Sequence, residues 1–147
     1  MYYYFVSYSF KNSKENRQGL GCAQITHDKP ITQFNDIIEM ANCLEKDAPN
    51  FGKFKLISFQ QLRIEDESQK EEPKVTNSKY HYFISYSFSN AKIGKTALDY
   101  SEIVLDKPIT HFNDILDIAN TLSKNNILAE KCTILNFQLL RVENENE

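Results

Sequence analysis

The chain has 147 residues, with 17 Lys and Arg against 20 Asp and Glu, and a formal net charge of −3. This charge provides no broad basic field, which excludes sequence-independent binding to nucleic acid, and it is too small for a convincing DNA mimic. No apolar run approaches the roughly 20 residues that span a bilayer, and the N-terminus lacks the basic region of a secretory signal, so we expect a cytoplasmic protein without a membrane partner.

The second half of the chain repeats the first without a gap, at a spacing of roughly 78 residues. The segment Tyr2–Phe10 (YYYFVSYSF) recurs as Tyr80–Phe88 (YHYFISYSF), and Asp28–Asn42 recurs as Asp106–Asn120. About 30 of about 66 aligned positions are identical, which chance does not supply. We predict a first repeat over residues 1–66, a polar linker over 67–79, a second repeat over 80–143 and an acidic tail over 144–147.

Each repeat opens with period-two alternation, which predicts a strand with one aromatic core face. In the first repeat, the face toward the core is Tyr2, Tyr4, Val6, Tyr8 and Phe10, and the other face is Tyr3, Phe5, Ser7 and Ser9. A second strand follows at Leu20–His27 and at Ala97–Leu105, the latter with Tyr100, Ile103 and Leu105 as apolar anchors. The two strands of each repeat should form a hairpin.

A helix is predicted after Pro30 and Pro108, where Thr32 and Thr110 offer hydroxyl groups to the free backbone N–H groups of the first turn. The first turn also contains Asp36 in one repeat and Asp114 in the other, and the helix dipole stabilises negative charge at that end. The expected core stripe is Phe34, Ile37, Ile38, Ala41 and Leu44, matched in the second repeat by Phe112, Ile115, Leu116, Ala119 and Leu122.

The last strand of each repeat, Phe54–Ile64 and Cys132–Val142, carries apolar residues at both parities. Simple alternation puts Leu56, Leu62 and Ile64 on one face and Ile57 and Phe59 on the other, and in the second repeat it groups Leu135, Phe137 and Leu139. We therefore expect the sister repeat, another chain or a ligand to cover the second face. The fold class is α+β: a tandem duplication of a β-β-α-β module, each a small antiparallel sheet with one helix on one face.

Metal, disulfide and cofactor chemistry find little support in the comparison of the two repeats. No cysteine or histidine recurs at an aligned position: Cys22, Cys43 and Cys132 align with Tyr100, Thr121 and Phe54, and His27, His81 and His111 align with Leu105, Tyr3 and Gln33. A zinc site or histidine base shared by both repeats is excluded. There is no glycine-rich phosphate loop, so we expect no cofactor.

Polar residues that recur in both repeats are the better candidates. Arg63 and Arg141 each precede a glutamate, Glu65 or Glu143, by two residues, which favours a structural ion pair on one strand face. The alternative is a clamp for a phosphate or carboxylate, since guanidinium groups bind both in bidentate fashion.

A second set of candidates lies on the opening strands. Ser7 and Ser85 sit on the predicted face away from the helix beside Phe5 and Phe83, where small hydroxyl groups next to an aromatic ring leave room for a partner. We group Phe137 with them. A solvated strand face is the alternative.

The sequence resembles a loosely defined group of small proteins encoded by phages and prophages of Gram-positive bacteria. The resemblance covers most of both repeats and rests on an FxSYSF strand, a D-x-P-I helix start and a closing I-x-F or L-N-F strand. The corresponding segments are Phe5–Phe10, Phe83–Phe88, Asp28–Ile31, Asp106–Ile109, Ile57–Phe59 and Leu135–Phe137. It implies an accessory phage protein in the cytoplasm of the bacterial host, and such proteins are often antagonists of bacterial immunity.

Our leading hypothesis is a non-enzymatic protein that antagonises a bacterial defence system. One mechanism is docking on a defence protein, as an anti-CRISPR-like inhibitor does, through Phe5, Ser7, Phe83, Ser85 and Phe137. The other is sequestration of a cyclic-nucleotide-type immune signal, with Arg63 and Arg141 holding phosphates. Alternatives are a structural protein that self-associates into a homo-oligomer, and a small nucleotide hydrolase using Asp36/Asp114 or Glu65/Glu143.

Overall fold

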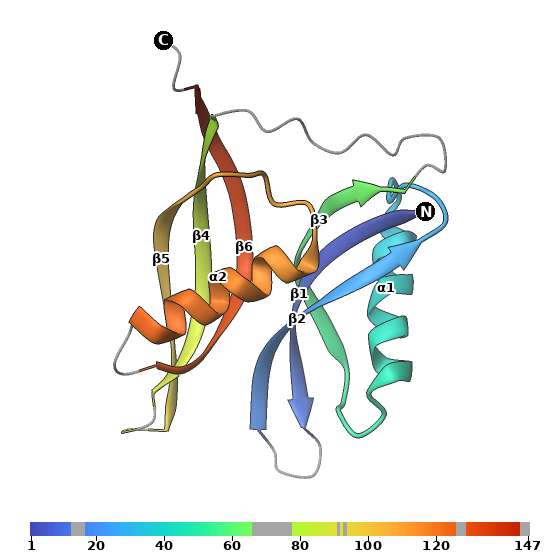
Figure 1. The fold of residues 1–147 in the computed structure, drawn as a ribbon. Coiled ribbons are helices and arrows are strands. Elements are labelled where there is room, and N and C mark those ends of the chain that lie inside the picture. The colour runs from blue at the N-terminus through green and yellow to red at the C-terminus, as the bar shows by residue number, and fades with distance from the viewer. Residues whose placement is uncertain (13–16, 66–77, 91, 93, 126–128, 145–147) are drawn as a thin grey trace. The chain divides into compact units, whose positions relative to one another are not determined.

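The computed structural model describes residues 1–12, 17–65, 78–90, 92, 94–125 and 129–144. The chain divides into two units, Met1–Ile64 and Glu65–Glu147, and each contains the order β-β-α-β (Figure 1). Unit 1 holds β1 (Tyr2–Asn12), β2 (Arg17–His27), α1 (Phe34–Asp47) and β3 (Phe54–Ile64). Unit 2 holds β4 (Ser78–Asn90), β5 (Lys95–Leu105), α2 (Phe112–Asn125) and β6 (Ala129–Asn144). The predicted α+β class and the duplicated module are confirmed.

The boundaries of the repeats differ slightly from the sequence prediction. Ser78 and Lys79, which we assigned to the linker, belong to β4, and Asn144, which we assigned to the tail, ends β6. Ser78 pairs with Asn144 at the end of the sheet, and its hydroxyl donates to the Asn144 side-chain oxygen at 2.8 Å. The rest of the predicted linker, residues 67–77, and residues 145–147 of the tail lie outside the described residues.

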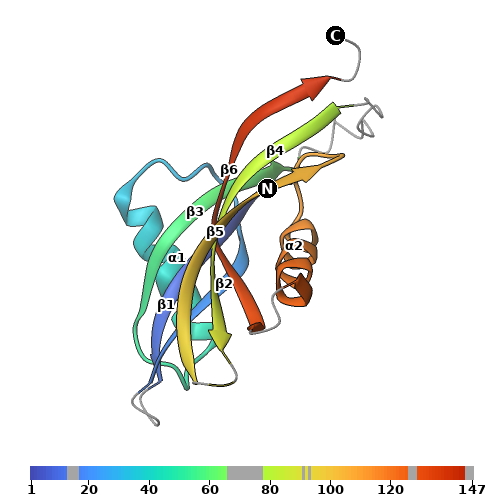
Figure 2. The same cartoon turned by 90° about the vertical axis from the view of Figure 1, so that its left-hand side faces the viewer.

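Each unit is a three-stranded antiparallel sheet with its first strand in the centre. The strand orders are β2-β1-β3 and β5-β4-β6. The predicted hairpins are regular, and their pairs run from Tyr2 with His27 to Asn12 with Arg17, and from Tyr80 with Leu105 to Asn90 with Lys95. In unit 2, α2 lies along one side of its sheet (Figure 2).

The core of each unit lies between the central strand and the helix. In unit 1, Tyr4 and Val6 of β1 pack with Met40 and Leu44 of α1 and with Phe54 of β3. Their burial removes apolar surface from water, at roughly 25 cal/mol for each Å². The core tyrosine also fixes the chain before the helix, because the Ile31 backbone N–H donates to the Tyr4 hydroxyl at 2.9 Å.

Unit 2 repeats this arrangement with different side chains. Ile84, Ile115 and Ile134 come from β4, α2 and β6, and each is at most 1% exposed. The Ile109 N–H donates to the Tyr82 hydroxyl at 3.0 Å, as in unit 1. The two units therefore bury different side chains on the same backbone plan.

The helix stripe is narrower than the sequence predicted. Met40 and Ile118, which we did not include, are buried, whereas Phe34 is 73% exposed and Ile38 and Leu116 are also exposed. Each helix packs mainly against the last strand of its unit, so it contacts the sheet along one line. Residues on the flank of the apolar stripe then remain in solvent.

Irregularities in the last strands overturn a second expectation. The register of β3 shifts between the partners of Tyr3 and Tyr4 and again between those of Ser7 and Tyr8, which leaves Ile57 and Leu62 without cross-strand partners. Each extra residue reverses the alternation. Phe59 therefore pairs with Val6, on the helix side of the sheet.

The second unit has both shifts at the equivalent places, and a third between the partners of Ser89 and Asn90. Phe137 pairs with Ile84, is 7% exposed and packs edge-on against Tyr82 at 6.2 Å between ring centroids. The expectation that Phe137 lies on the face away from the helix is wrong, because simple alternation ignores the bulges.

Candidate binding surfaces

The outer face of each sheet, defined as the face opposite its helix, carries four of the predicted docking residues. Phe5 and Ser7 lie there in unit 1, and Phe83 and Ser85 lie there in unit 2, because they alternate with core residues of β1 and β4. Phe5 and Ser7 are fully buried, whereas Phe83 and Ser85 are half-buried. The second pair therefore offers the accessible atoms, and a partner role for any of the four stays a prediction.

The two most exposed large apolar side chains among the described residues of unit 2, Leu98 and Tyr100, lie on the outer face of β5, together with Val104. Leu98 is 70% exposed, Tyr100 is 71% exposed and Val104 is 49% exposed. The Tyr100 ring lies 5.9 Å from the Phe83 ring, at an interplanar angle of 32°. We call Leu98, Tyr100, Val104 and Phe83 the β5 outer patch.

Sequence reasoning missed this patch. It treated Tyr100 as a core anchor together with Ile103 and Leu105, but a strand residue at an even position cannot share a face with residues at odd positions. Tyr100 pairs with Ser85 on the outer face, and Ile103 pairs with Tyr82 on the helix side. Stricter use of the period-two rule on β5 would have found the patch.

The outer face of unit 2 also holds a charged cluster around a histidine. His81 Nδ1 lies 2.8 Å from Glu102 Oε1, and His81 Nε2 lies 3.3 Å from Glu143 Oε2. Arg141 bridges the same carboxylates: its Nη1 lies 3.1 Å from Glu102 Oε1 and its Nε donates to Glu143 Oε1 at 2.9 Å. The predicted pairing of Arg141 with Glu143 is confirmed.

Hydrogen bonding stabilises the charged forms in this cluster. The bond with His81 lowers the pKa of Glu102, and the bond from Arg141 lowers the pKa of Glu143. The bond to Glu143 also raises the pKa of Arg141. A phosphate at Arg141 would have to displace two carboxylates.

In unit 1, different residues surround the equivalent arginine. Tyr3 replaces His81, Gln24 replaces Glu102, and the Arg63 guanidinium carbon lies 3.8 Å from the centroid of the Tyr3 ring. This is cation–π geometry. Both arginines are therefore held on the outer face, one by an aromatic ring and one by carboxylates.

A basic hollow in unit 1 was not predicted from the sequence. Its volume is about 550 Å³. Among the described residues, its lining holds three lysines and no acidic residue: Ser9, Phe10, Lys11, Gln18, Gly52, Lys53 and Lys55. Gly52 brings the chain close to β1, because its N–H donates to the Lys11 carbonyl at 2.6 Å and a Cβ there would lie 2.9 Å from that oxygen. In unit 2, Ser89 and Thr133 replace Lys11 and Lys55.

The recurrent aspartates serve the helices. Asp36 Oδ2 accepts the N–H groups of Thr32 and Gln33 at 3.0 and 2.9 Å, and Asp114 Oδ2 accepts those of Thr110 and His111 at 3.1 and 2.9 Å. The helix starts are thus capped by these carboxylates rather than by the expected threonine hydroxyls. This role uses the oxygens that a catalytic base would need.

The two carboxyl groups have lowered pKa values for related reasons. The backbone hydrogen bonds from Thr32 and Gln33 lower the pKa of Asp36. Burial tends to raise the pKa of Asp114, but hydrogen bonds from Lys107, His111 and Thr110 outweigh it and lower the pKa. Both groups are therefore held ionised at neutral pH.

No protein-family model matches the chain, and no curated protein matches it significantly. Within the described residues, neither helix is long and apolar enough to cross a membrane.

Proposed function

We propose that this protein is a non-enzymatic binding protein that docks on another protein through the β5 outer patch. The observation that carries the proposal is the exposure of Leu98 and Tyr100, at 70% and 71%, on one strand face beside Phe83. Large apolar and aromatic side chains gathered on a surface mark interaction sites, and aromatic residues supply most interface hot spots. Opposite Tyr100, the half-buried Ser85 provides a small side chain over which a partner can approach.

The partner we propose is a bacterial defence protein, blocked by direct docking in the manner of an anti-CRISPR-like inhibitor. This part rests on the resemblance to phage accessory proteins. The engagement of Arg63 by Tyr3 and of Arg141 by two carboxylates favours docking over a phosphate clamp built from these arginines.

The test is phage infection of defence-positive bacteria that express the protein. Leu98→Ser combined with Tyr100→Ser should remove protection of the phage, because the change deletes the apolar surface without touching the core. The matched control is Phe34→Ser, which alters an equally exposed apolar residue on α1 and should keep full protection. Equal protection by all three proteins would contradict docking through the patch.

A second candidate function, sequestration of a nucleotide immune signal, is favoured by the basic hollow of unit 1. Lys11, Lys53 and Lys55 line one space, and lysine ammonium groups bind phosphates as point charges. Isothermal titration with a cyclic dinucleotide should show binding that Lys11→Gln with Lys55→Gln abolishes. Lys131→Gln in unit 2 is the control, and an absence of heat with the unaltered protein would exclude this candidate for that ligand.

A further inference from the structure

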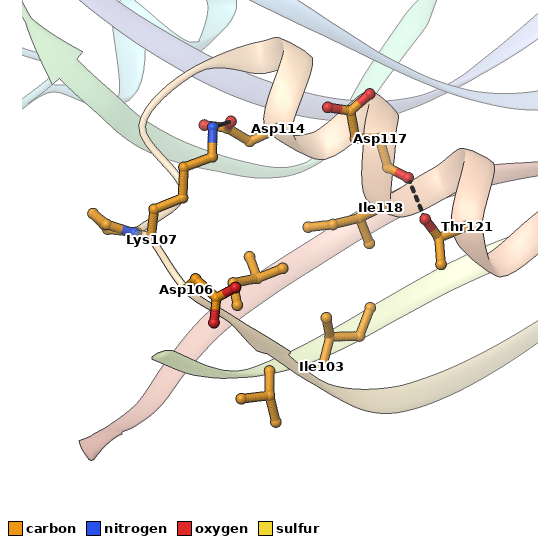
Figure 3. A pocket seen from close by; sticks show the side chains of 10 residues that line it. Ile103, Asp106, Lys107, Asp114, Asp117, Ile118 and Thr121 are labelled. Carbon is orange, nitrogen blue, oxygen red and sulfur yellow. Dashed lines mark hydrogen bonds and ion pairs between the residues drawn. The ribbon is translucent and has the colours of Figure 1, made fainter. Parts of the chain in front are cut away.

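A groove lies between β5 and α2, on the helix side of the sheet in unit 2 (Figure 3). Its volume is about 460 Å³. It forms because α2 packs mainly against β6, so that β5 extends beyond the cover of the helix. The lining residues come from the end of β5, the segment after it and one side of α2.

The groove has an apolar floor and an acidic rim. Ile103 and Leu105 of β5 and Ile118 of α2 line the floor. In Figure 3, Ile118 points toward Ile103. The rim carries Asp114 and Asp117 on the helix. Such a surface suits a ligand with both an apolar and a cationic group.

The carboxylates at the rim differ in the hydrogen bonds and ion pairs that they make. Asp114 is bonded to Lys107 Nζ at 2.7 Å and caps the helix, and Asp106 is paired with Lys79. In the part of the chain that the structure describes, the carboxylate of Asp117 makes no ion pair. Asp117 is therefore the acidic group with which a ligand cation can pair.

The strand beside the groove is also available for backbone pairing. β5 is an edge strand of its sheet, with β4 on one side only. Alternate residues of an edge strand direct their N–H and C=O groups outward, where an extended peptide can add as a further strand. Side chains of such a peptide that point to the helix side would enter the groove.

The equivalent place in unit 1 shows which side chains can fill the space between the edge strand and the helix. In unit 1, His27 replaces Leu105 and Glu39 replaces Asp117, and His27 Nε2 lies 3.8 Å from Glu39 Oε2. The imidazole thus bridges the edge strand to the helix carboxylate, and it is only 15% exposed. Unit 2 has the carboxylate and the space, but a leucine in place of the bridging group.

We propose that the β5–α2 groove binds an extended peptide segment of a partner protein, which adds to the edge of β5. An apolar side chain of the peptide contacts Ile103 and Ile118, and a lysine or arginine two residues away pairs with Asp117. This site lies on the side of β5 opposite the outer patch, so the inference goes beyond the proposed docking function and does not depend on it.

The experiment is selection of a displayed library of random nine-residue peptides on the full-length protein, with Leu105→His as the counter-selection target. The change installs the residue that unit 1 has at this position, and it should close the groove. We expect enriched sequences that alternate apolar residues with lysine or arginine. A fluorescent copy of the most enriched peptide is then measured by anisotropy on individual variants.

Leu105→His and Asp117→Asn should each weaken binding by about tenfold or more. Glu39→Gln, the matched change in unit 1, and Tyr100→Ser, on the outer patch, should leave the affinity unchanged. If Leu105→His does not fold, as judged by thermal unfolding, Asp117→Asn decides, because it alters an exposed helix residue.

Three results would overturn the proposal. One is an absence of enrichment above a bare support, and another is enrichment of peptides without lysine or arginine. The third is binding that survives Asp117→Asn but is lost in Tyr100→Ser, which would place the peptide on the outer patch instead.

Discussion

Asp36 and Asp114 occupy the same position in the two repeats and have the same structural role. Each carboxylate accepts two backbone N–H groups before the first helical turn, groups that would otherwise lose their hydrogen bonds. The recurrence of these two aspartates is thus explained by their place at a helix start.

Removing the cap in unit 2 should destabilise the protein measurably. We predict that Asp114→Ala lowers the free energy of unfolding by about 0.5–2 kcal/mol, the usual cost of a lost N-terminal cap. Urea unfolding at neutral pH measures it. Asp117→Ala, one turn further along α2, should cost less, and an equal cost for the two would contradict the capping role.

The lowered pKa values of Asp114, Glu102 and Glu143 predict acid sensitivity. A carboxyl group with a lower pKa in the folded state contributes stability that is present above its unfolded pKa of about 4 and is lost as pH falls through the folded value. Urea unfolding between pH 7 and pH 3 should therefore show falling stability. Asp114→Asn should flatten this dependence, and an unchanged slope would show that Asp114 titrates alike in both states.

The exchange of His81 for Tyr3 between the units offers a test by transplantation. His81→Tyr should be tolerated, because unit 1 already holds its arginine over a tyrosine ring. His81→Ala should lower the melting temperature, since it leaves Glu102 and Glu143 without the imidazole between them. Thermal unfolding measures both, and a larger loss for the tyrosine than for the alanine would contradict the equivalence of the two arrangements.

At the scale of elements, strands were easier to predict than the faces they present. The period-two pattern of Tyr2–Phe10 is strong because only one face of β1 meets the helix, and the prediction placed this strand correctly. Phe137 was assigned to the wrong face because bulges in β6 shift its register. The sequence of β6 has apolar residues at both odd and even positions, so the bulges cannot be recognised from it. Cross-strand pairing decides the register there, and one strand alone does not contain that information.

The helices were misjudged for a related reason. Phe34 and Met40 are both apolar and both near the stripe, but the helix meets its sheet along one line, which depends on packing against β3. We predict that Met40→Ala costs about 2–5 kcal/mol of stability, as large-to-small core substitutions do. Phe34→Ala should cost far less, and urea unfolding of both variants would reveal the opposite order if the stripe were as the sequence suggested.

At the scale of the whole molecule, the two units share a backbone plan and differ in their surfaces. Several positions that are identical between the repeats hold the helix starts or fill the cores, as Asp36 with Asp114 and Tyr4 with Tyr82 do, and they led to the correct fold class. The β5 outer patch, the basic hollow and the β5–α2 groove each combine identical positions with differing ones: Leu98 aligns with Leu20, whereas Tyr100 aligns with Cys22 and Leu105 with His27. Identity between the repeats therefore predicted the fold well but did not single out these surfaces.

Native mass spectrometry tests the central claim of docking most directly. The protein is recovered from lysate of phage-infected, defence-positive bacteria, and its mass is compared with that of the purified protein. We predict the added mass of a whole protein at fixed stoichiometry, lost in Leu98→Ser with Tyr100→Ser and kept in Phe34→Ser. A gain of only several hundred daltons, a mass of self-associated chains alone, or a partner retained by the patch variant would contradict it.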